Sequence, residues 1–256
     1  MSKSSTTDQA YTPAFYGRME EMALQSSTII VDIIMQMFHP AAVADVGCGT
    51  GGWLRTFAQR GVKRIQGYEA GWLDPEQVII PREQFAAIDL SQTMPSIPPC
   101  DLVLSLEVAE HLPARMAEPL VACLCQAAPV VLFSAAVPGQ GGTQHINEQP
   151  HLYWRKLFAR RAYACIDAIR PRIWADRRVD WPYRQNIFLF LPEEVLACYP
   201  DLGRFRLSAD NKNLTVLRES ILEGQATLDA HPLPDLCRAL LTKVRRRMLR
   251  GKARRE

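Results

Sequence analysis

Short apolar runs alternate with longer amphipathic segments along most of this 256-residue chain. Seven of the apolar runs are predicted to form strands. These predicted strands span 42–47, 63–70, 84–90, 100–106, 129–137, 163–170 and 185–191. Helical spacing of apolar residues covers 14–38, 52–61, 113–128 and 150–162. The alternation of strands and helices predicts an α/β domain with a mostly parallel sheet and helices on both faces.

Single residues add detail to two of the predicted helices. We expect the first helix, 14–38, to form two pieces that are broken near Ser26 and Ser27. Gly61 follows the second helix at the position where glycine commonly ends a helix.

The composition is that of one ordinary soluble domain with some extra length, with 48% apolar and 22% charged residues. No apolar run approaches the roughly 18 to 20 residues that span a bilayer. The polar N-terminus lacks the apolar core of a signal peptide. Seven scattered cysteines are an odd number, which fits reduced thiols. We therefore expect a cytoplasmic protein, and we expect no metal site.

The basic charge is concentrated in the last fourteen residues, which carry eight Lys or Arg against one Glu. This local charge of +7 within a net charge of +3 leaves about −4 for the rest of the chain. From Leu236 onward, leucines at helical spacing with Arg and Lys between them predict a basic amphipathic helix. Such a helix suits an anionic membrane surface, so the protein could lie peripherally at the inner membrane. The alternatives are an extension that packs back on the domain and a contact with nucleic acid.

A glycine-rich turn, 45–53, connects the first predicted strand to a helix. Such a turn brings backbone N–H groups close to a ligand at a helix N-terminus. Gly47, Gly49 and Gly52 satisfy the G-x-G-x-x-G pattern of dinucleotide sites, which is a weak signal by itself. Asp45 argues against a nicotinamide cofactor, because an acid here can hold the glycine loop and attract an ammonium group. S-adenosylmethionine carries such a group.

Two further acids follow the second and third predicted strands. Glu69 comes twenty residues after Gly49 and is expected to bind both ribose hydroxyls of the cofactor. Asp89 is expected to bind the adenine amino group. Each of these acids, like Asp45, could instead cap a helix or brace a loop.

In order along the chain, Asp45-x-Gly47-x-Gly49-x-Gly51, the two later acids and the string CDLVLSLEVAEHL resemble the class I S-adenosylmethionine-dependent methyltransferases. The resemblance covers about residues 40–192. It implies a Rossmann-like seven-stranded sheet in the order 3-2-1-4-5-7-6, with the last strand antiparallel. It also implies S-adenosylmethionine as the cofactor. The expected cofactor-binding residues are Asp45, Gly47, Gly49, Gly51, Glu69, Asp89, Leu90 and Leu106.

Later strings are similar to a bacterial subgroup of this superfamily that is found among sugar, polysaccharide and natural-product gene sets. These strings are SLEVAEHLP, FSAAVPGQGGTQHINEQ and a W-Y-x-Q-N pattern, from which Pro182 departs by separating the Trp from the Tyr. We expect 1–39 to be an N-terminal helical lid region and 40–200 to be the S-adenosylmethionine-binding methyltransferase domain. The remaining segment, 201–256, is expected to be a C-terminal helical extension with the basic tail.

Polar side chains gather after the fourth and fifth predicted strands. Ligands of open α/β sheets lie beyond the carboxyl ends of the strands, so the loop 141–149 is expected to face the methyl group or the acceptor. Glu107 and His111 are four residues apart and would share one face of a helix. We predict His111, His145 and Glu107 as catalytic residues, with histidine as the base for an acceptor hydroxyl. An orienting or structural role is the alternative for each of them.

The run WPYRQN could close the acceptor pocket, and Arg184 within it could bind a carboxylate or phosphate or form a surface ion pair. The predicted acceptor-binding residues are Asn147, Tyr153, Trp181, Tyr183 and Arg184.

The sequence therefore predicts methyl transfer from S-adenosylmethionine to a small molecule or a sugar or glycan acceptor, at oxygen. Two other classes stay open. One is an enzyme that displaces within the cofactor's own aminobutyrate chain and releases methylthioadenosine, and the other is a non-enzymatic binding module. A nucleic-acid methyltransferase is disfavoured, because no N-P-P-Y-type string follows the fourth strand and the chain outside the tail is slightly acidic.

Overall fold

The computed structural model of this chain describes residues 13–71 and 73–207, with side chains from Leu24 onward. All of these residues belong to the first of two units, 1–216, and the second unit, 217–256, lies outside the described residues. The basic tail lies there as well, so its amphipathic helix and its membrane contact stay predictions. The boundaries of the three predicted segments also stay predictions. Within the described residues, no helix is long and apolar enough to cross a membrane.

Seven strands form where the seven apolar runs predict them. They are β1 Ala42–Val46, β2 Arg64–Glu69, β3 Phe85–Ala87, β4 Leu102–Leu106, β5 Val130–Ser134, β6 Tyr163–Ile166 and β7 Phe188–Pro192. The α-helices are α1 Pro13–Phe38, α2 Gly52–Gln59, α3 Ala117–Ala127, α4 His151–Ala159, α5 Arg170–Ile173, α6 Trp181–Asn186, α7 Glu193–Leu196 and α8 Pro200–Gly203. Short 3-10 helices are η1 Pro75–Gln77, η2 Arg82–Gln84, η3 Ala109–His111 and η4 Ala114–Met116.

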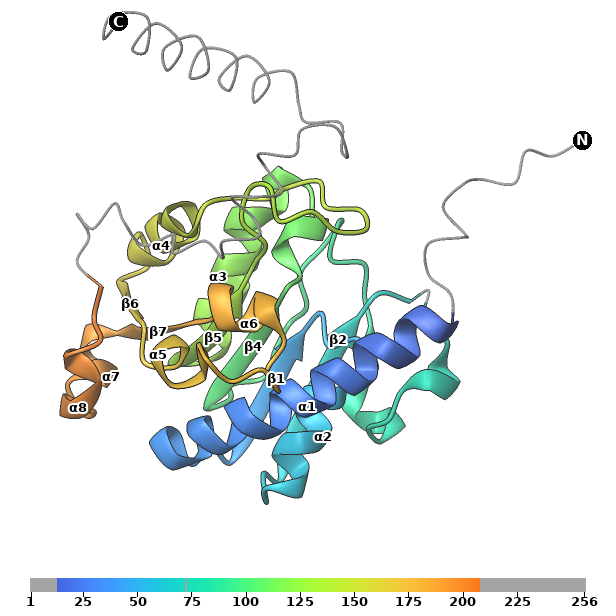
Figure 1. Ribbon diagram of the computed structural model, residues 1–256, viewed down its shortest axis with the longest axis horizontal. Coiled ribbons are helices and arrows are strands. Elements are labelled where there is room, and N and C mark those ends of the chain that lie inside the picture. Colours follow the sequence, from blue (N-terminus) through green and yellow to red (C-terminus); the bar gives the residue numbers. More distant parts are fainter. Residues whose placement is uncertain (1–12, 72, 208–256) are drawn as a thin grey trace, which may run out of the picture. The chain divides into compact units, whose positions relative to one another are not determined.

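The strands form one sheet in the order β3-β2-β1-β4-β5-β7-β6 (Figure 1). Neighbouring strands from β3 to β5 pair in parallel, whereas β7 runs antiparallel to both β5 and β6. This arrangement confirms the predicted Rossmann-like methyltransferase fold, including the reversed last strand. The strand order reverses between β1 and β4, and at such a switch point the loops beyond the carboxyl ends diverge and leave room for a ligand.

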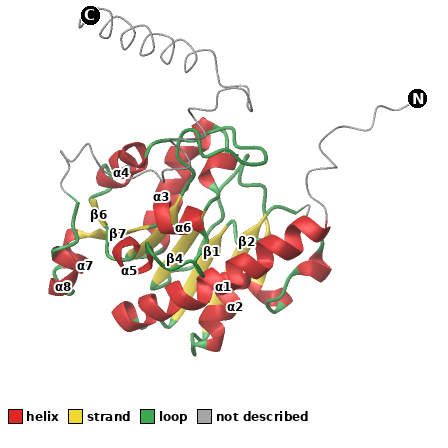
Figure 2. Ribbon diagram, viewed as in Figure 1, coloured by secondary structure: helices red, strands yellow, loops and turns green. Residues whose placement is uncertain are grey.

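Both faces of the sheet are covered by helices, so successive residues of one strand enter different cores. Leu104 of β4 lies in the core that contains Phe57 of α2 and the buried face of α1. Val103, its neighbour in the same strand, lies in the core that contains Phe158 of α4 and the buried face of α3. Figure 2 shows α1 and α2 in front of the strands and the long loop before α4 above them. With both faces covered by helices, the functional side chains are expected in the loops beyond the strand ends.

Helix α1 is continuous, so the predicted break near Ser26 and Ser27 is wrong. Both serine side chains are buried, and both hydroxyls have partners. Ser27 Oγ lies 2.7 Å from Thr56 Oγ1 of α2 and donates to the Leu24 carbonyl at 3.0 Å. Ser26 Oγ accepts from the amide of Asp180 at 2.9 Å. These small polar residues let α2 and the segment before α6 pack closely on α1, and they do not interrupt the helix.

Several elements are shorter than the patterns predict. Strand β3 ends at Ala87, so Asp89 lies beyond it, and α4 begins only after Pro150. Gly61 follows α2 with a φ of +94°, which confirms it as the helix stop. Pro182 lies in the first turn of α6, where the missing N–H of proline costs nothing, so it fits the start of this helix.

Candidate functional site

The turn between β1 and α2 is built from three glycines with positive φ. Gly47, Gly49 and Gly51 have φ values of +83°, +54° and +94°, a region that other residues rarely adopt. A Cβ at Gly47 would lie 2.3 Å from Val108 Cγ2, whereas a Cβ at Gly49 would meet no atom within 4 Å. The turn is therefore packed tightly against the loop after β4 and leaves space beside Gly49.

Glu69, the last residue of β2, holds this turn. Its carboxylate accepts from the amides of Gly49 at 2.8 Å and Ala70 at 2.7 Å. Burial raises the pKa of Glu69, although these two hydrogen bonds oppose the shift. The side chain of Asp45 is buried on the neighbouring strand β1, and burial and then the charge of Glu69 raise its pKa to about 7. We expected Asp45 to hold the glycine loop, but the hydrogen bonds to the loop come from Glu69.

The other residues predicted for the cofactor lie at the ends of β3 and β4. Asp89 is exposed, and its Oδ1 accepts from the amide of Ser91 at 2.9 Å. Hydrogen bonds with Ser91 hold the pKa of Asp89 below its ordinary value. Leu90 and Leu106 are both buried. Asp89 therefore braces a turn in this structure, and its contact with adenine stays a prediction.

Glu107 follows β4 and does not share a helix with His111, so that prediction is wrong. The φ of Glu107 is +53°, which a helix does not allow, and the next helical turn is only the short 3-10 helix η3. The amide of Glu107 lies 3.1 Å from the carbonyl and 3.0 Å from the hydroxyl of Ser134. These bonds fix the loop after β4 to the end of β5.

Asn186, at the end of α6, is the centre of a buried polar network. Its side-chain amide donates to the two Glu107 carboxylate oxygens at 3.1 and 3.3 Å and to Gln140 Oε1 at 2.9 Å. Its carbonyl oxygen lies 3.1 Å from His151 Nε2 and accepts from Gln185 at 3.2 Å. Gln140 also donates to Glu107 at 2.9 Å. Burial raises the pKa of Glu107, and the hydrogen bonds from Gln140 and Asn186 oppose that shift.

His111 and His145 come together from two different loops. Their ring centroids are 4.8 Å apart and the rings are nearly perpendicular. Burial and then the neighbouring His145 lower the pKa of His111 to about 4, so its imidazole is neutral at pH 7. Glu110 lies beside both rings, and one ligand atom of each of the three residues is within 4.8 Å of the others.

Glu148 organises the loop that carries His145. Its carboxylate accepts from the amides of Gly139 at 2.8 Å and Gly141 at 2.7 Å, and His145 Nδ1 lies 2.9 Å from it. Burial raises the pKa of Glu148, but these hydrogen bonds outweigh burial and hold the pKa below its ordinary value. A Cβ at Gly142 would lie 2.3 Å from His145 Nε2, so the glycine packs against the ring. The position of His145 is thus determined by its own loop.

Tyr183 of α6 lies between the glycine turn and the loops after β4 and β5. Its ring centroid is 5.1 Å from that of Trp53 in α2, and the two rings meet edge to face. Burial and then the charge of Glu107 raise the pKa of Tyr183 above its ordinary range, and Asp45 adds to the shift. One side chain is therefore close to the acids of both parts of the site.

The other predicted acceptor-binding residues are not gathered in one place. Asn147 is buried and donates to a backbone carbonyl of η3 at 3.3 Å. Arg184 donates to the carbonyl of Trp174 at 3.2 Å. Tyr153 and Trp181 are half-buried, on α4 and at the start of α6. A contact of these residues with an acceptor stays a prediction.

Several polar residues of this region were not predicted from the sequence. They are Glu110, Gln140, Glu148, His151 and Gln185. Glu110 and Glu148 lie one and three residues from the predicted histidines, and that spacing could have pointed to them. Gln140 has no such signal.

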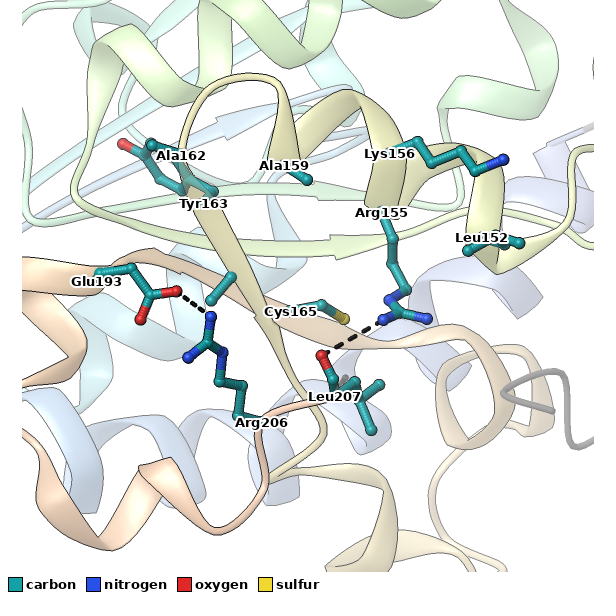
Figure 3. Close-up of a pocket in the computed structure, with 11 residues that line it drawn as sticks. Leu152, Arg155, Lys156, Ala159, Ala162, Tyr163, Cys165, Glu193, Arg206 and Leu207 are labelled. Carbon is teal, nitrogen blue, oxygen red and sulfur yellow. Dashed lines mark hydrogen bonds and ion pairs between the residues drawn. The ribbon is translucent and has the colours of Figure 1, made fainter. Parts of the chain in front are cut away.

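A separate cavity of about 290 Å³ lies between α4 and the edge strand β6 (Figure 3). Arg155 donates to the carbonyl of Leu207 at 3.4 Å beside it, and Glu193 pairs with Arg206 on its rim. None of the residues predicted for cofactor, acceptor or catalysis lines it. This cavity does not belong to the site at the carboxyl ends of β1, β4 and β5.

No protein-family model matches this chain, and no curated protein sequence matches it. Among solved structures, it is similar to DesVI of Streptomyces venezuelae at 13% identity, over 74% of this chain and 99% of that chain, with a TM-score of 0.52. Magnesium protoporphyrin IX methyltransferase of Synechocystis, with bound S-adenosylhomocysteine, matches at 17% identity over 67% and 84%, with a TM-score of 0.48. CalS10, an amino pentose methyltransferase of Micromonospora echinaspora, matches at 17% over 70% and 97%, with a TM-score of 0.47. At this level of identity, the likeness to DesVI supports the fold alone.

Proposed function

We propose that this chain is an S-adenosylmethionine-dependent methyltransferase that acts on a hydroxyl group of a small molecule or of a sugar or glycan. One observation carries the proposal, the contact between the glycine turn and the loop after β4. Gly47 packs against Val108, the residue next to Glu107, so the two loops are direct neighbours. A ligand bound at the turn would therefore lie next to side chains that can accept a proton.

The residues around the turn fit S-adenosylmethionine. The space beside Gly49 can admit a ligand close to the backbone. The buried carboxyl of Asp45 suits the cofactor's ammonium group, because a nearby positive charge stabilises the ionised form of an acid. Glu69 holds the turn and still has lone pairs for ribose hydroxyls. When bound, S-adenosylmethionine supplies a methyl group that its sulfonium has already activated.

The remaining residues need to align the acceptor and exclude water, and proximity supplies much of the rate. An attacking hydroxyl must also lose a proton, which makes a nearby base useful. Glu107, His111 and His145 are gathered beyond β4 and β5, and this favours a hydroxyl over an amine or a thiol. Tyr183 is suited to contact both ligands, because it is close to the acids of both parts of the site.

The acceptor class rests on the strings at 105–113 and 133–149, which are similar to a subgroup found among sugar and natural-product gene sets. The test is incubation with labelled S-adenosylmethionine and a panel of sugars, sugar nucleotides and carboxylates, with mass readout of both products. Methyl transfer yields S-adenosylhomocysteine and a methylated acceptor in equal amounts. Release of methylthioadenosine would instead support internal displacement, and tight cofactor binding without turnover on any acceptor would support a binding module.

A further inference from the structure

Glu110, His111 and His145 form a compact group of metal-ligating side chains beside Glu107. One ligand atom of each lies within 4.8 Å of the other two. The group joins η3 to the loop before α4, and the backbone fixes this junction. The amides of Ile146 and Asn147 both donate to the Glu110 carbonyl, at 2.9 and 3.0 Å. The three side chains are therefore held together by the fold and not by a chance approach of surface rotamers.

The carboxyl group of Glu110 is the feature of this group that calls for a ligand. Its side chain is fully buried, and neither carboxylate oxygen has a hydrogen-bonding partner among the residues that the structure describes. It lies near Glu107 and near the amide of Ala136, but in neither case with the geometry of a hydrogen bond. A buried carboxyl without a partner is costly and rare in a folded protein. A cation between Glu110 and the two imidazoles would satisfy it.

The two histidines have the arrangement of metal ligands. The Nδ1 of His145 lies 2.9 Å from the Glu148 carboxylate. This contact favours a proton on Nδ1 and leaves the lone pair on Nε2, as in carboxylate–histidine–metal arrangements. The His111 ring packs edge-on against the His145 ring, with 4.8 Å between the ring centroids. Each histidine can therefore offer one ring nitrogen to an ion that lies between the two rings and Glu110.

We propose that Glu110, His111 and His145 bind a divalent first-row transition-metal ion. Two imidazoles and one carboxylate are a ligand set that suits such ions better than Mg²⁺ or Ca²⁺, which prefer oxygen. Ligand distances of about 2.0–2.2 Å put two donor atoms at most about 4.4 Å apart. A separation of 4.8 Å between two ligand atoms would therefore shorten by about 0.4 Å or more on binding. Three protein ligands leave coordination positions open.

An acceptor hydroxyl could take one of these positions, next to Glu107 as a base. Metal-bound hydroxyl groups lose a proton more readily. That use of the ion rests on the proposed methyl transfer, whereas the metal site itself does not. It also changes the roles of His111 and His145 from bases to ligands.

The experiment is metal binding by the full chain without S-adenosylmethionine. Protein stripped with a chelator is titrated in a calorimeter with Mn²⁺, Co²⁺, Zn²⁺ and Mg²⁺, and bound Co²⁺ is followed by its visible absorption. We expect a single transition-metal ion per chain and much weaker binding of Mg²⁺. Wild-type protein that binds none of the transition-metal ions would overturn the proposal.

Two variants and a matched control locate the site. Glu110→Gln and His145→Ala each remove a ligand and should weaken Co²⁺ binding by about 100-fold or more. His39→Ala removes an exposed histidine at the amino end of β1 and should bind Co²⁺ like the wild type. Circular dichroism melting checks each fold, and His145→Ala decides the question if Glu110→Gln does not fold. Equal Co²⁺ affinity of folded His145→Ala and wild type would overturn the assignment.

Titration of the same samples with S-adenosylmethionine separates this inference from the proposed function. A chain that binds the cofactor but no metal loses the metal site and keeps the proposed function. A chain that binds the metal but not the cofactor keeps the metal site and loses the proposed function.

Discussion

Two neighbouring parts of the sheet's carboxyl edge are built in different ways. After β1 and β2, the glycine turn is shaped by backbone conformation, with three positive φ values inside five consecutive residues and one acid that accepts from the backbone. After β4 and β5, the loops are shaped by side chains, and the Asn186 amide joins Glu107 to Gln140 and His151 across 35 to 79 positions of the chain.

The two parts should therefore tolerate different amino-acid substitutions. A backbone-built turn needs glycine at particular positions, so one added side chain changes it. A side-chain network needs every donor and acceptor to be paired, so loss of one group leaves others buried without partners. The first part is suited to hold a cofactor shared by many enzymes, and the second is suited to be adapted to one acceptor.

The largest effect is expected in the backbone-built part. Gly49→Val should weaken S-adenosylmethionine binding by about 1,000-fold, or about 4 kcal/mol, because the side chain fills the space beside the turn. The φ of +54° should also lower the free energy of unfolding by about 1–2 kcal/mol. Calorimetry and urea unfolding measure the two effects.

Gly61→Val is the matched control for this variant. Gly61 also has a positive φ, +94°, and a Cβ there would also meet no atom within 4 Å, but it lies at the far end of α2. Gly61→Val should therefore lower the free energy of unfolding and leave the affinity for S-adenosylmethionine unchanged. Unchanged cofactor binding by folded Gly49→Val would remove the turn from the binding site.

The side-chain network should respond differently. Asn186→Leu keeps the branching and the number of heavy atoms of the side chain but removes the donor to Glu107 and Gln140. We therefore expect a loss of about 2–3 kcal/mol in the free energy of unfolding. Turnover should fall strongly while cofactor affinity changes little. A double-mutant cycle with Glu107→Gln should give a coupling of about 1 kcal/mol or more. Additive effects would show that the two residues act independently.

The pH dependence of cofactor binding should distinguish the two parts further. Asp45 has an ordinary pKa of 3.8 and a folded-state pKa of about 7, raised by burial and then by Glu69. An ammonium group favours its ionised form, so wild-type affinity should rise about 10-fold between about pH 6 and 8. Asp45→Asn cannot ionise, so its affinity should be lower at pH 8 and nearly independent of pH. An equal rise in both proteins would assign the titration to another group.

The free energy of unfolding should depend on pH in the opposite direction to cofactor affinity, in that wild type should lose stability relative to Asp45→Asn as the pH rises. Because folding raises the pKa of Asp45, its burial costs little below about pH 4 and costs more as the pH rises to about 7. Asp45→Asn should therefore gain stability relative to wild type across that range, by up to a few kcal/mol at about 1.4 kcal/mol per pKa unit. Urea unfolding at several pH values measures the difference, and a constant difference would contradict the raised pKa.

The smallest effect is expected at the loop anchor. Glu148→Gln keeps the size of the side chain but weakens its bonds to two loop amides and to His145, so a loss of about 1 kcal/mol is expected. Turnover should fall by about 5-fold, because His145 is less well fixed. The control is Glu193→Gln, which breaks an exposed pair with Arg206 and should change neither quantity. Equal behaviour of the two variants would show that the loop needs no anchor.

Local sequence determined much of the fold and of the glycine turn. Apolar runs predicted all seven strands, and Gly61 predicted the end of α2. The order of the strands came from a family resemblance, and the sheet confirms it. The turn at Gly47, Gly49 and Gly51 could be predicted because glycine and positive φ are properties of single residues and their neighbours.

Tertiary structure decided the rest, because side-chain pairing depends on which loops the sheet brings together. The sequence predicted a helix break at Ser26 and Ser27. In the fold, α2 and the Asp180 amide supply partners for their hydroxyls. Glu107 and His111 were expected on one helix face, but the link of Glu107 to Ser134 of the adjacent strand comes with a φ of +53° that prevents it.

The contacts between side chains in the site's second part were beyond any local pattern. Glu110 meets His145 only because β4 and β5 are neighbours, so that the loops after them fold over the same edge. Asn186 reaches Glu107 because β7 runs antiparallel beside β5 and brings α6 to that edge. The sequence by itself determined where loops and strands occur and which turn needs glycine. Only the order and direction of the strands decided which polar side chains share a buried space, because that sharing depends on distance across the sheet and not along the chain.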